Sequence, residues 1–385
     1  MVKMPVKKSN KSRFSLYEPF IGKLEKAYVN DCLNSKWISS RGKYGKLFED
    51  KFKSFIKIKY AVAVCNGTAA LHVALLALGI GEKDEVITPT FTYIATANSI
   101  NYVGASVKFV DSKKTSWQID EDKISNHITS KTRAVLVPHI YGQACEMNKI
   151  KQICKKNKLF LIEDCAEAFG TKIKGVSVGT FGQMSIFSFA PNKILTTGEG
   201  GAICTDSRKI FEKLQLIRSH GRLINENYFK TSQSPNYISI GYNWRMSSMT
   251  AALGLSQFDK LDRIIQLRRR HARFYVSKLK KINEIKLPDE PKDHLHVYQL
   301  FTIQLKNNLI RHKLQKFLAS KGIMTKVFFE PIHLSKFYKK SGFGKKSLSN
   351  TEKISRTVLS LPIFPGLKSE EITHICDSIK EFFQN

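Results

Sequence analysis

The sequence predicts an α/β protein with a mostly parallel, buried sheet and a smaller C-terminal domain. Between residues 60 and 220, short apolar runs alternate with Gly or Pro turns and amphipathic segments, which is the pattern of strands alternating with helices. The apolar runs are nearly continuous, as expected for strands that helices cover on both faces. With 385 residues, the chain also exceeds the usual size of one domain.

The individual elements follow from these runs. The runs expected to form buried strands are YAVAVC (60–65), DEVITP (84–89), SVKFVD (106–111), RAVLVP (133–138) and KLFLIED (158–164). The amphipathic segments expected to form helices include TAALHVALLALGIG (68–81), YIATANSINYVG (93–104) and MNKIKQICKKN (147–157). Strands and helices in this order imply parallel pairing, because each helix returns the chain to the end of the sheet at which the previous strand began.

The pattern changes after residue 245. It is helical over residues 245–282, and a Pro-bearing segment at 286–294 separates this stretch from apparent strands at 297–305 and 326–334, with helices between and after them. We therefore expect three parts: a flexible basic tail over 1–13, a large domain over 14–260 and a small C-terminal α+β domain over 261–385.

The composition indicates a soluble, cytoplasmic protein. Hydrophobic residues make up 42% and charged residues 25% of the chain, which is ordinary globular usage, and no apolar stretch is long enough to cross a bilayer. The basic N-terminus lacks the apolar core of a secretory signal. Seven cysteines without a C-x-x-C pair indicate reduced thiols rather than a disulfide framework.

The formal net charge of +31 suits an anionic ligand, but it does not favour nucleic acid. The lysines are spread over the whole chain, and the one dense arginine run, LRRRHAR near residue 270, lies on an expected helix. No zinc-finger spacing or RNA-binding aromatic motif accompanies the charge. A general richness in lysine is the favoured explanation, and small polyphosphate ligands remain compatible with it.

In open α/β sheets, ligands bind beyond the carboxyl ends of the strands, so the residues that follow each strand are candidates for a binding site. After YAVAVC come Asn66, Gly67 and Thr68 at the start of a helix. Gly67 allows a close backbone approach, Thr68 can cap the helix, and the free N–H groups favour a phosphate. The alternative is an ordinary turn with a helix cap.

Asp164 ends the apolar run KLFLIED. A buried carboxylate must be paired, or it becomes neutral. It could cap a helix formed by CAEAFG (165–170), or it could be a counter-ion that holds a proton on a ring nitrogen. The residues of this segment alone favour neither interpretation.

The segment SFAPNKILTTGEGG (188–201) places Ser188 at the end of an expected strand and Lys193 in the loop that follows. A lone lysine in a Gly-rich loop is usually a solvated charge. Here a phosphate-ready helix start and a buried carboxylate are expected at the same sheet edge, and pyridoxal phosphate (PLP) needs a phosphate cup, a pyridinium partner and an amine. Neither a Walker motif nor G-x-G-x-x-G is present.

These segments together resemble the DegT/StrS-type sugar-nucleotide aminotransferases, which are fold-type I PLP enzymes. The likeness extends from about residue 14 to the C-terminus. The motifs that carry it are NGTAALHVALLALGIGEKDEVITPTFTYIATANSI, IEDCAEAFGTKIKGVSVGTFG, FSFAPNKILTTGEGGAICT, GYNWRMSSMTAALGLSQFDKLD and SLPIFPGL. The resemblance implies a seven-stranded, mostly parallel sheet flanked by helices in the large domain.

The resemblance also implies roles for single residues. Lys193 would form the Schiff base with the cofactor and move the proton during transfer. Asp164 would pair with the pyridine nitrogen, and Glu167 would lie near the ring hydroxyl. The remaining expected cofactor residues are Gly67, Thr68 and Ser188 at the phosphate, Tyr93 stacked on the ring, and Asn243, which would reach the phosphate of the neighbouring subunit in a homodimer.

The reaction implied by the resemblance has two halves. Glutamate would donate its amino group to the cofactor, and C4 of a nucleotide-linked 4-keto-6-deoxy sugar would then accept it. Segments LYEPFIGK and KWISSRGKY are most similar to the enzymes that form GDP-perosamine for surface polysaccharides, and UDP- or dTDP-linked sugars are the alternatives. The expected substrate residues are Trp37, Ser39, Arg245, His333 and Tyr338, and no metal is expected.

Two departures from the family pattern concern specificity. Ala190 stands where relatives often place an aromatic residue or histidine, and residues 222–240 replace a shorter segment. A dehydratase relative would have histidine in place of Lys193, and a C3 aminotransferase would have an L-G-x-x-G-D-G-G motif where this chain has TTGEGG. A non-catalytic regulator that binds nucleic acid would need no cofactor.

Overall fold

The computed structural model describes residues 14–222, 232, 234–345 and 347–384. The expected flexible tail at 1–13 and most of the segment 222–240 lie outside the described residues. The predictions about the tail, and about the effect of that segment on specificity, therefore stay predictions.

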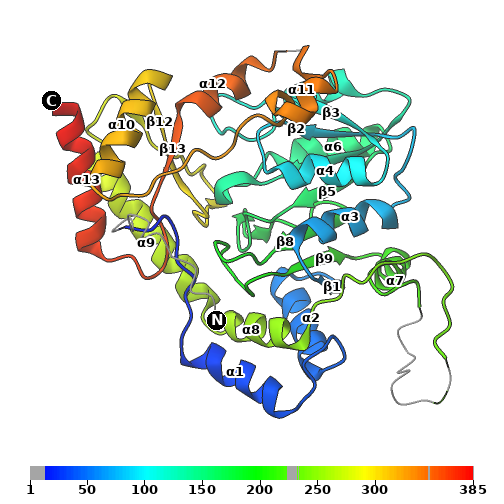
Figure 1. The fold of residues 1–385 in the computed structure, drawn as a ribbon. Coiled ribbons are helices and arrows are strands. Elements are labelled where there is room, and N and C mark those ends of the chain that lie inside the picture. Colours follow the sequence, from blue (N-terminus) through cyan, green and yellow to red (C-terminus); the bar gives the residue numbers. More distant parts are fainter. Residues whose placement is uncertain (1–13, 223–231, 233, 346, 385) are drawn as a thin grey trace, which may run out of the picture.

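The centre of the structure is a seven-stranded sheet (Figure 1). In spatial order its strands are β1 (Tyr60–Val64), β9 (Gly201–Thr205), β8 (Met184–Ser188), β5 (Phe160–Asp164), β4 (Thr132–Pro138), β2 (Glu85–Pro89) and β3 (Ser106–Val110). Strand β9 runs antiparallel to both of its neighbours, and every other pairing is parallel. The predicted α/β fold with a mostly parallel sheet is confirmed.

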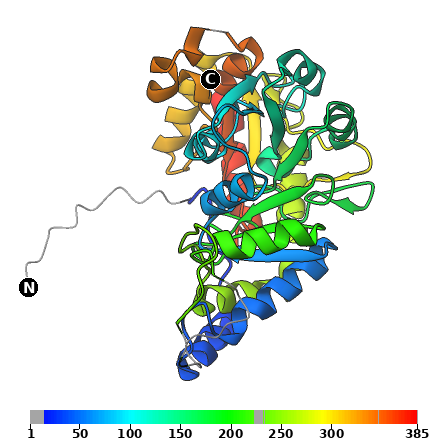
Figure 2. The ribbon, with the colours of Figure 1, turned by 90° about the vertical axis from the view of Figure 1, so that its right-hand side faces the viewer.

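Successive strand residues point to opposite faces of the sheet, and both faces are buried. Val62 and Val64 of β1 pack into one core cluster, while Ala61 and Ala63 pack into another. The first cluster includes residues of α3 (Gly67–Ala77), α4 (Ile94–Tyr102) and α7 (Arg208–Ile217). The second includes residues of α2 (Lys43–Ile56), α6 (Met147–Lys156) and α8 (Ser248–Phe258). Helices therefore cover both faces, as Figure 2 shows.

The C-terminal part has its own core. It contains the 19-residue helix α9 (Leu261–Leu279), a three-stranded antiparallel sheet, and the helices α10 (Asn308–Ser320), α12 (Ser349–Thr357) and α13 (Ser369–Gln384). The strands are β10 (Ile285–Lys286), β12 (Phe301–Leu305) and β13 (Val358–Leu361). The expected helical stretch 245–282 is thus two helices, α8 and α9.

The expected strand at 326–334 is wrong. Only Lys326 pairs with a strand, through a bridge to Ser360 of β13, and the segment ends in the short 3-10 helix η3 (Ile332–Leu334). Two features explain the difference: Pro331 has no N–H to donate to a ladder, and Phe329 is buried among aromatic residues near the central sheet. The third strand of the small sheet is β13 instead.

Several further elements complete the described fold. They are α1 (Lys23–Asn34), α5 (Glu121–Ile124), α11 (Lys336–Lys340), β6 (Lys172–Ile173), β7 (Val176–Ser177) and β11 (His294–Leu295). Strand β11 pairs with β6, and Phe14 forms a bridge to Ile323. The division at residue 260 into two domains stays a prediction. In the part of the chain that the structure describes, no helix is both long and apolar enough to span a membrane.

Candidate active site

A cavity of about 440 Å³ lies at the carboxyl ends of the parallel strands. It is lined by every predicted cofactor residue except Asn243, together with Ala190: Gly67, Thr68, Tyr93, Asp164, Glu167, Ser188 and Lys193. These residues come from four segments at the carboxyl ends of β1, β2, β5 and β8. The parallel sheet brings them together, because the carboxyl ends of parallel strands meet at one edge.

One wall of the cavity is the start of α3. Asn66 caps this helix, and its side-chain oxygen accepts a hydrogen bond from the N–H of Ala69 at 2.8 Å. The expected cap at Thr68 is therefore wrong, because Thr68 lies inside the first turn of the helix. A Cβ atom on Gly67 would lie 2.7 Å from Cβ of Ser188, so the glycine lets the helix start and the end of β8 touch. The helix start, Thr68 and Ser188 thus line the same part of the cavity, and the free N–H groups of a helix start suit a phosphate.

Asp164 lies at the end of β5 and is 6% exposed. Its carboxylate accepts hydrogen bonds from Thr96 Oγ1 at 3.0 Å and from the N–H of Ala166 at 3.1 Å. Burial raises the pKa of this carboxyl above its usual value, and the charge of Lys193 opposes that rise. No helix forms over residues 165–170, so the helix-cap interpretation is wrong. A buried acid of this kind needs a cationic partner.

Lys193 and Glu167 face each other across the cavity floor. Nζ of Lys193 lies 3.4 Å from Oε1 of Glu167, and the other carboxylate oxygen accepts the N–H of Tyr141 at 2.9 Å. The loop that carries the lysine is closed at its base, because Phe189 N–H donates to the Gly200 carbonyl and Thr197 N–H donates to the Phe189 carbonyl, both at 2.9 Å. The lysine therefore extends from a short loop whose two ends are joined by backbone hydrogen bonds.

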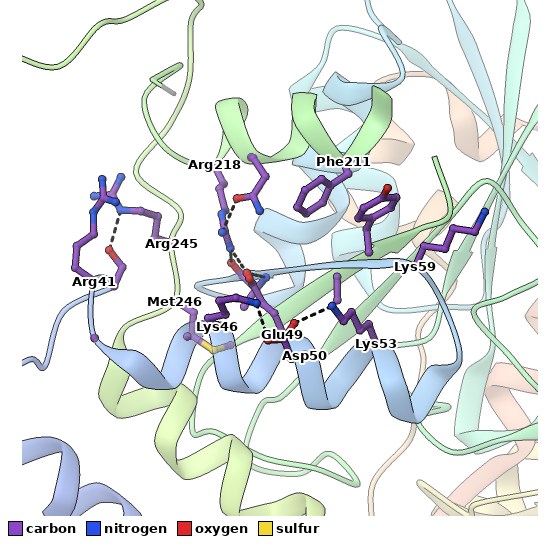
Figure 3. A pocket seen from close by; sticks show the side chains of 17 residues that line it. Arg41, Lys46, Glu49, Asp50, Lys53, Lys59, Phe211, Arg218, Arg245 and Met246 are labelled. Carbon is purple, nitrogen blue, oxygen red and sulfur yellow. Dashed lines mark hydrogen bonds and ion pairs between the residues drawn. The ribbon is translucent and has the colours of Figure 1, made fainter. Parts of the chain in front are cut away.

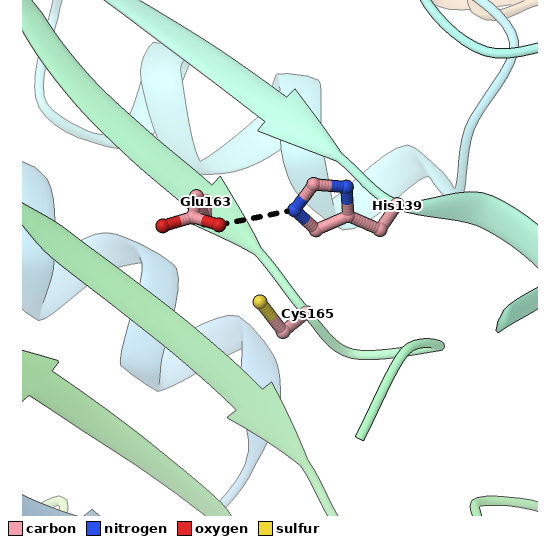
Figure 4. A group of neighbouring side chains, drawn as sticks. All are labelled: His139, Glu163 and Cys165. Carbon is pink, nitrogen blue, oxygen red and sulfur yellow. Dashed lines mark hydrogen bonds and ion pairs between the residues drawn. The ribbon is translucent and has the colours of Figure 1, made fainter. Parts of the chain in front are cut away.

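His139 and Glu163 lie next to this site and were not singled out from the sequence. His139 accepts the N–H of Cys145 at Nδ1 (3.1 Å), so its proton resides on Nε2, which faces Glu163 Oε2 at 3.3 Å (Figure 4). Glu163 also accepts three backbone N–H bonds from residues 179, 181 and 182 at 2.7–2.8 Å. With Cys165, these side chains have the composition of a metal site, but N–H groups already occupy the carboxylate.

Comparison with known proteins decides the family. Residues 19–380 match the DegT/DnrJ/EryC1/StrS aminotransferases. The chain belongs to this family. GDP-perosamine synthase of Escherichia coli O157:H7 is 41% identical to it over 370 residues, which are 96% of this chain and 98% of that enzyme.

Solved structures of relatives agree with the family. Helicobacter pylori PseC, an aminotransferase involved in the biosynthesis of pseudoaminic acid, has a TM-score of 0.90 at 29% identity, over 96% of this chain and 99% of PseC. The PLP form of Spr1654 from Streptococcus pneumoniae also has a TM-score of 0.90, at 25% identity, over 96% of this chain and 98% of that one. The protein is thus a PLP-dependent sugar-nucleotide aminotransferase, which confirms the predicted family, enzyme class and cofactor.

The cavity of this aminotransferase fits the cofactor. Burial alone disfavours the ionised form of Asp164, and a protonated pyridine nitrogen beside it would supply the positive charge that stabilises this form. The helix start at Gly67, in close contact with Ser188, would hold the phosphate, and Lys193 would supply an amine from the same cavity. Tyr93, which is 62% exposed at the opening, can cover one ring face.

The remaining predicted residues of the aminotransferase do not line this cavity. Trp37 is exposed on the loop before α2, and a backbone carbonyl of that loop, from Ser39, accepts the N–H of Ser248 at 3.0 Å. His333 is buried and hydrogen-bonded to Thr90 Oγ1 at 2.9 Å.

Tyr338 is buried too, and its hydroxyl donates to Asn98 at 3.1 Å and accepts from Asn101 at 2.7 Å. Asn243 pairs through its backbone with Ser219. The structure thus places these residues, and the substrate and subunit roles expected for them stay predictions.

Arg245 borders a second cavity of about 580 Å³ (Figure 3). It donates to Ser40 at 3.1 Å and to Ser219 at 3.3 Å. The walls carry the cations Arg41, Lys46, Lys53, Lys59, Arg218 and Arg245 and the carboxylates Glu49 and Asp50. Glu49 pairs with Arg218 at 2.5 Å, so part of this charge is compensated within the chain.

Proposed function

We propose that this aminotransferase moves the amino group of glutamate to C4 of GDP-4-keto-6-deoxymannose and so forms GDP-perosamine for a surface polysaccharide such as O-antigen. The observation that carries the proposal is the 41% identity to an enzyme of that activity over nearly the whole of both chains, supported by a second GDP-perosamine synthase, from Vibrio cholerae, at 39%. The lysine, the buried acid and the phosphate cup in one cavity support the chemistry.

When bound, PLP withdraws electrons from the substrate carbon and carries the amino group between the two half-reactions. Lys193 would be the base that takes the proton from the α-carbon of glutamate, and in the second half-reaction it would return a proton at the sugar carbon. Asp164 would hold the proton on the pyridine nitrogen of the bound cofactor. Glu167 keeps the lysine amine in place, because its carboxylate lies 3.4 Å from Nζ.

The substrates of the proposed reaction are anionic, and the cavity mouth provides a cation for them. Lys326 lines the cavity, and its Nζ lies 4.9 Å from the ring centre of Phe328. Its backbone is fixed in both directions by Ser360, with hydrogen bonds of 3.2 and 2.8 Å. We assign this ammonium group to the carboxylate of the donor or the diphosphate of the sugar.

We also propose that the active unit is a homodimer in which Asn243 reaches the phosphate site of the partner subunit. Within its own subunit, Asn243 lies outside the Lys193 cavity, which supports a role elsewhere. We expect the purified protein to be a dimer. We also expect activity to return when the Lys193→Ala and Asn243→Ala variants are mixed, and to rise with the proportion of mixed dimers, because one of the two sites in a mixed dimer has both residues. A fully active monomer would contradict this part of the proposal.

The main test is an amination assay with a panel of sugars. The purified enzyme, loaded with PLP and supplied with glutamate, is offered GDP-, UDP- and dTDP-linked 4-keto-6-deoxyhexoses, and the aminated position is determined by NMR. We expect C4 amination of the GDP-linked sugar and none with Lys193→Ala. Faster turnover of a UDP- or dTDP-linked sugar, or amination at C3, would refute the assigned substrate.

A further inference from the structure

Gln299 connects the C-terminal part of the chain to the loop that carries Lys193. It lies just before β12 and is 2% exposed. Its side-chain Nε2 donates a hydrogen bond to the backbone carbonyl of Asn192 at 2.6 Å. Asn192 directly precedes Lys193, so this bond acts on the peptide unit that joins the two residues.

The same segment also holds the partner of the lysine. The N–H of Val297 donates to the carbonyl of Gly142 at 3.2 Å, and the N–H of Leu300 donates to the carbonyl of Tyr141 at 3.3 Å. Tyr141 in turn donates its N–H to Glu167. Residues 297–300 therefore contact, on one side, the loop of Lys193 and, on the other, the turn that orients Glu167.

Close packing makes this arrangement rigid. A Cβ atom on Gly142 would lie only 2.7 Å from the backbone nitrogen of Gln299, so the two chain segments touch without a side chain between them. From behind, the buried Arg268 of α9 donates to the carbonyls of Tyr298 at 3.1 Å and Gln299 at 3.3 Å. A donor held in this way can define the position of a loop.

The chemistry of the Gln299 side chain points to its donor function. Its Oε1 atom is buried, and no hydrogen-bond partner for it is found among the described residues. A buried acceptor without a partner is unfavourable, and an apolar side chain of the same size would avoid that cost. The amide therefore gains stability at this place only through the bond that it donates to Asn192.

We propose that Gln299 is a positioning residue that fixes the position of the Lys193 loop in the cavity and so aligns the lysine amine with Glu167 and the cofactor. It acts through the Asn192 carbonyl and needs no contact with substrate. The inference rests on the role proposed for Lys193, but it does not depend on which sugar nucleotide is used.

The test uses the full chain without cofactor, so that its outcome is separate from the assigned reaction. Gln299→Met keeps the length of the side chain and removes the donor. We expect amide hydrogen exchange of residues 189–197 to become about tenfold faster in this variant. In loaded protein, we expect PLP to bind about tenfold more weakly and kcat to fall more than the KM for glutamate changes.

Gln304→Met is the matched control. Gln304 lies in β12, the strand that follows Gln299, and its Nε2 donates to Thr357 Oγ1 at 2.9 Å. Loss of this hydrogen bond should change amide hydrogen exchange only in the C-terminal part and leave the exchange of residues 189–197 as in wild type. Equal exchange of those residues in Gln299→Met and wild type, or the same acceleration in Gln304→Met, would overturn the proposal.

Gln299→Glu provides a second variant in case the methionine variant does not fold. The introduced carboxyl group has the same shape, and it can donate to the Asn192 carbonyl only when it is protonated. Loop exchange, corrected for the intrinsic effect of pH, should therefore approach the wild-type value at acid pH and exceed it at alkaline pH. A variant whose loop exchange differs from wild type by the same factor at every pH would contradict a donor role.

Discussion

Lys193 Nζ lies 3.4 Å from Oε1 of Glu167, while Oε2 of the same carboxylate accepts the N–H of Tyr141 at 2.9 Å. The carboxylate thus has two functions. It holds the lysine amine inside the cavity, and it accepts the backbone N–H of Tyr141, which is almost fully buried. These functions can be separated by substitution.

Glu167→Ala removes both functions, and Glu167→Gln retains an acceptor for Tyr141. An unsatisfied buried N–H costs about 1–3 kcal/mol, so we expect the alanine variant to lose about that much of its free energy of unfolding and the glutamine variant clearly less. Urea denaturation of the cofactor-free proteins measures the difference. Equal losses in the two variants would show that the Tyr141 contact contributes little.

Gly67→Ala tests the phosphate cup. The new Cβ would lie 2.7 Å from Cβ of Ser188, so α3 and β8 must move apart, at a strain cost of about 1–3 kcal/mol. We expect weaker binding of both PLP and inorganic phosphate, measured by equilibrium dialysis. Gly81→Ala is the control, because its Cβ would meet only the Val103 carbonyl at 3.7 Å. Similar phosphate affinities in the two variants would contradict the cup.

Much of this site could be predicted from the sequence, because its chemistry follows strand ends. Asp164, Ser188 and Gly67 each lie at or just after the end of an apolar run, and a parallel sheet brings such positions to one edge. The sequence does not show which of two adjacent acids faces the cavity. Glu163 and Asp164 point to opposite sides of β5, and both are buried, although only Asp164 was singled out.

The residues that could not be predicted act across long sequence separations. Gln299 meets Asn192 from 107 residues away, and no period or motif encodes such a contact. The expected strand at 326–334 failed for a related reason: its apolar pattern reflects the packing of Phe329 against Phe91 and Tyr141, and periodicity alone cannot distinguish this from strand pairing.

Lys326→Met tests the proposed anion contact at the cavity mouth. Among the residues that line this cavity, Lys193 and Lys326 are the cations. We expect the KM of the anionic partner to rise about tenfold, the value of one charge-assisted contact of 1.4 kcal/mol, with little change in kcat. Single-turnover assays of PLP-loaded enzyme with glutamate, and of enzyme loaded with pyridoxamine phosphate with the sugar nucleotide, identify which anion is bound.

Lys313→Met, on the exposed side of α10, is the control for the loss of one positive charge. The effect of Lys326→Met should also shrink at high ionic strength, because salt screens an exposed charge. If both half-reactions keep their KM within about twofold, Lys326 does not bind substrate.

Asp164→Asn should separate function from stability. Burial raises the pKa of this carboxyl, so the folded protein holds the proton more tightly than the unfolded chain does, and the ionised form costs stability as pH rises through the raised pKa. In cofactor-free protein we expect the variant to have a higher Tm than wild type at neutral pH, and no difference below about pH 4. PLP should bind the variant more weakly. A variant that is less stable than wild type at neutral pH would contradict this account.

The cluster of His139, Glu163 and Cys165 should be indifferent to metals. Three backbone N–H groups at 2.7–2.8 Å already occupy the two oxygens of Glu163, and a cation would have to displace them. We expect dialysis against EDTA to leave the Tm and PLP binding unchanged. Glu163→Gln should cost at least about 2 kcal/mol of unfolding free energy, because its amide presents a donor to N–H donors, whereas Cys165→Ala should cost less. One equivalent of zinc or iron per chain in the purified protein, lost in both variants, would show instead that the cluster is a metal site.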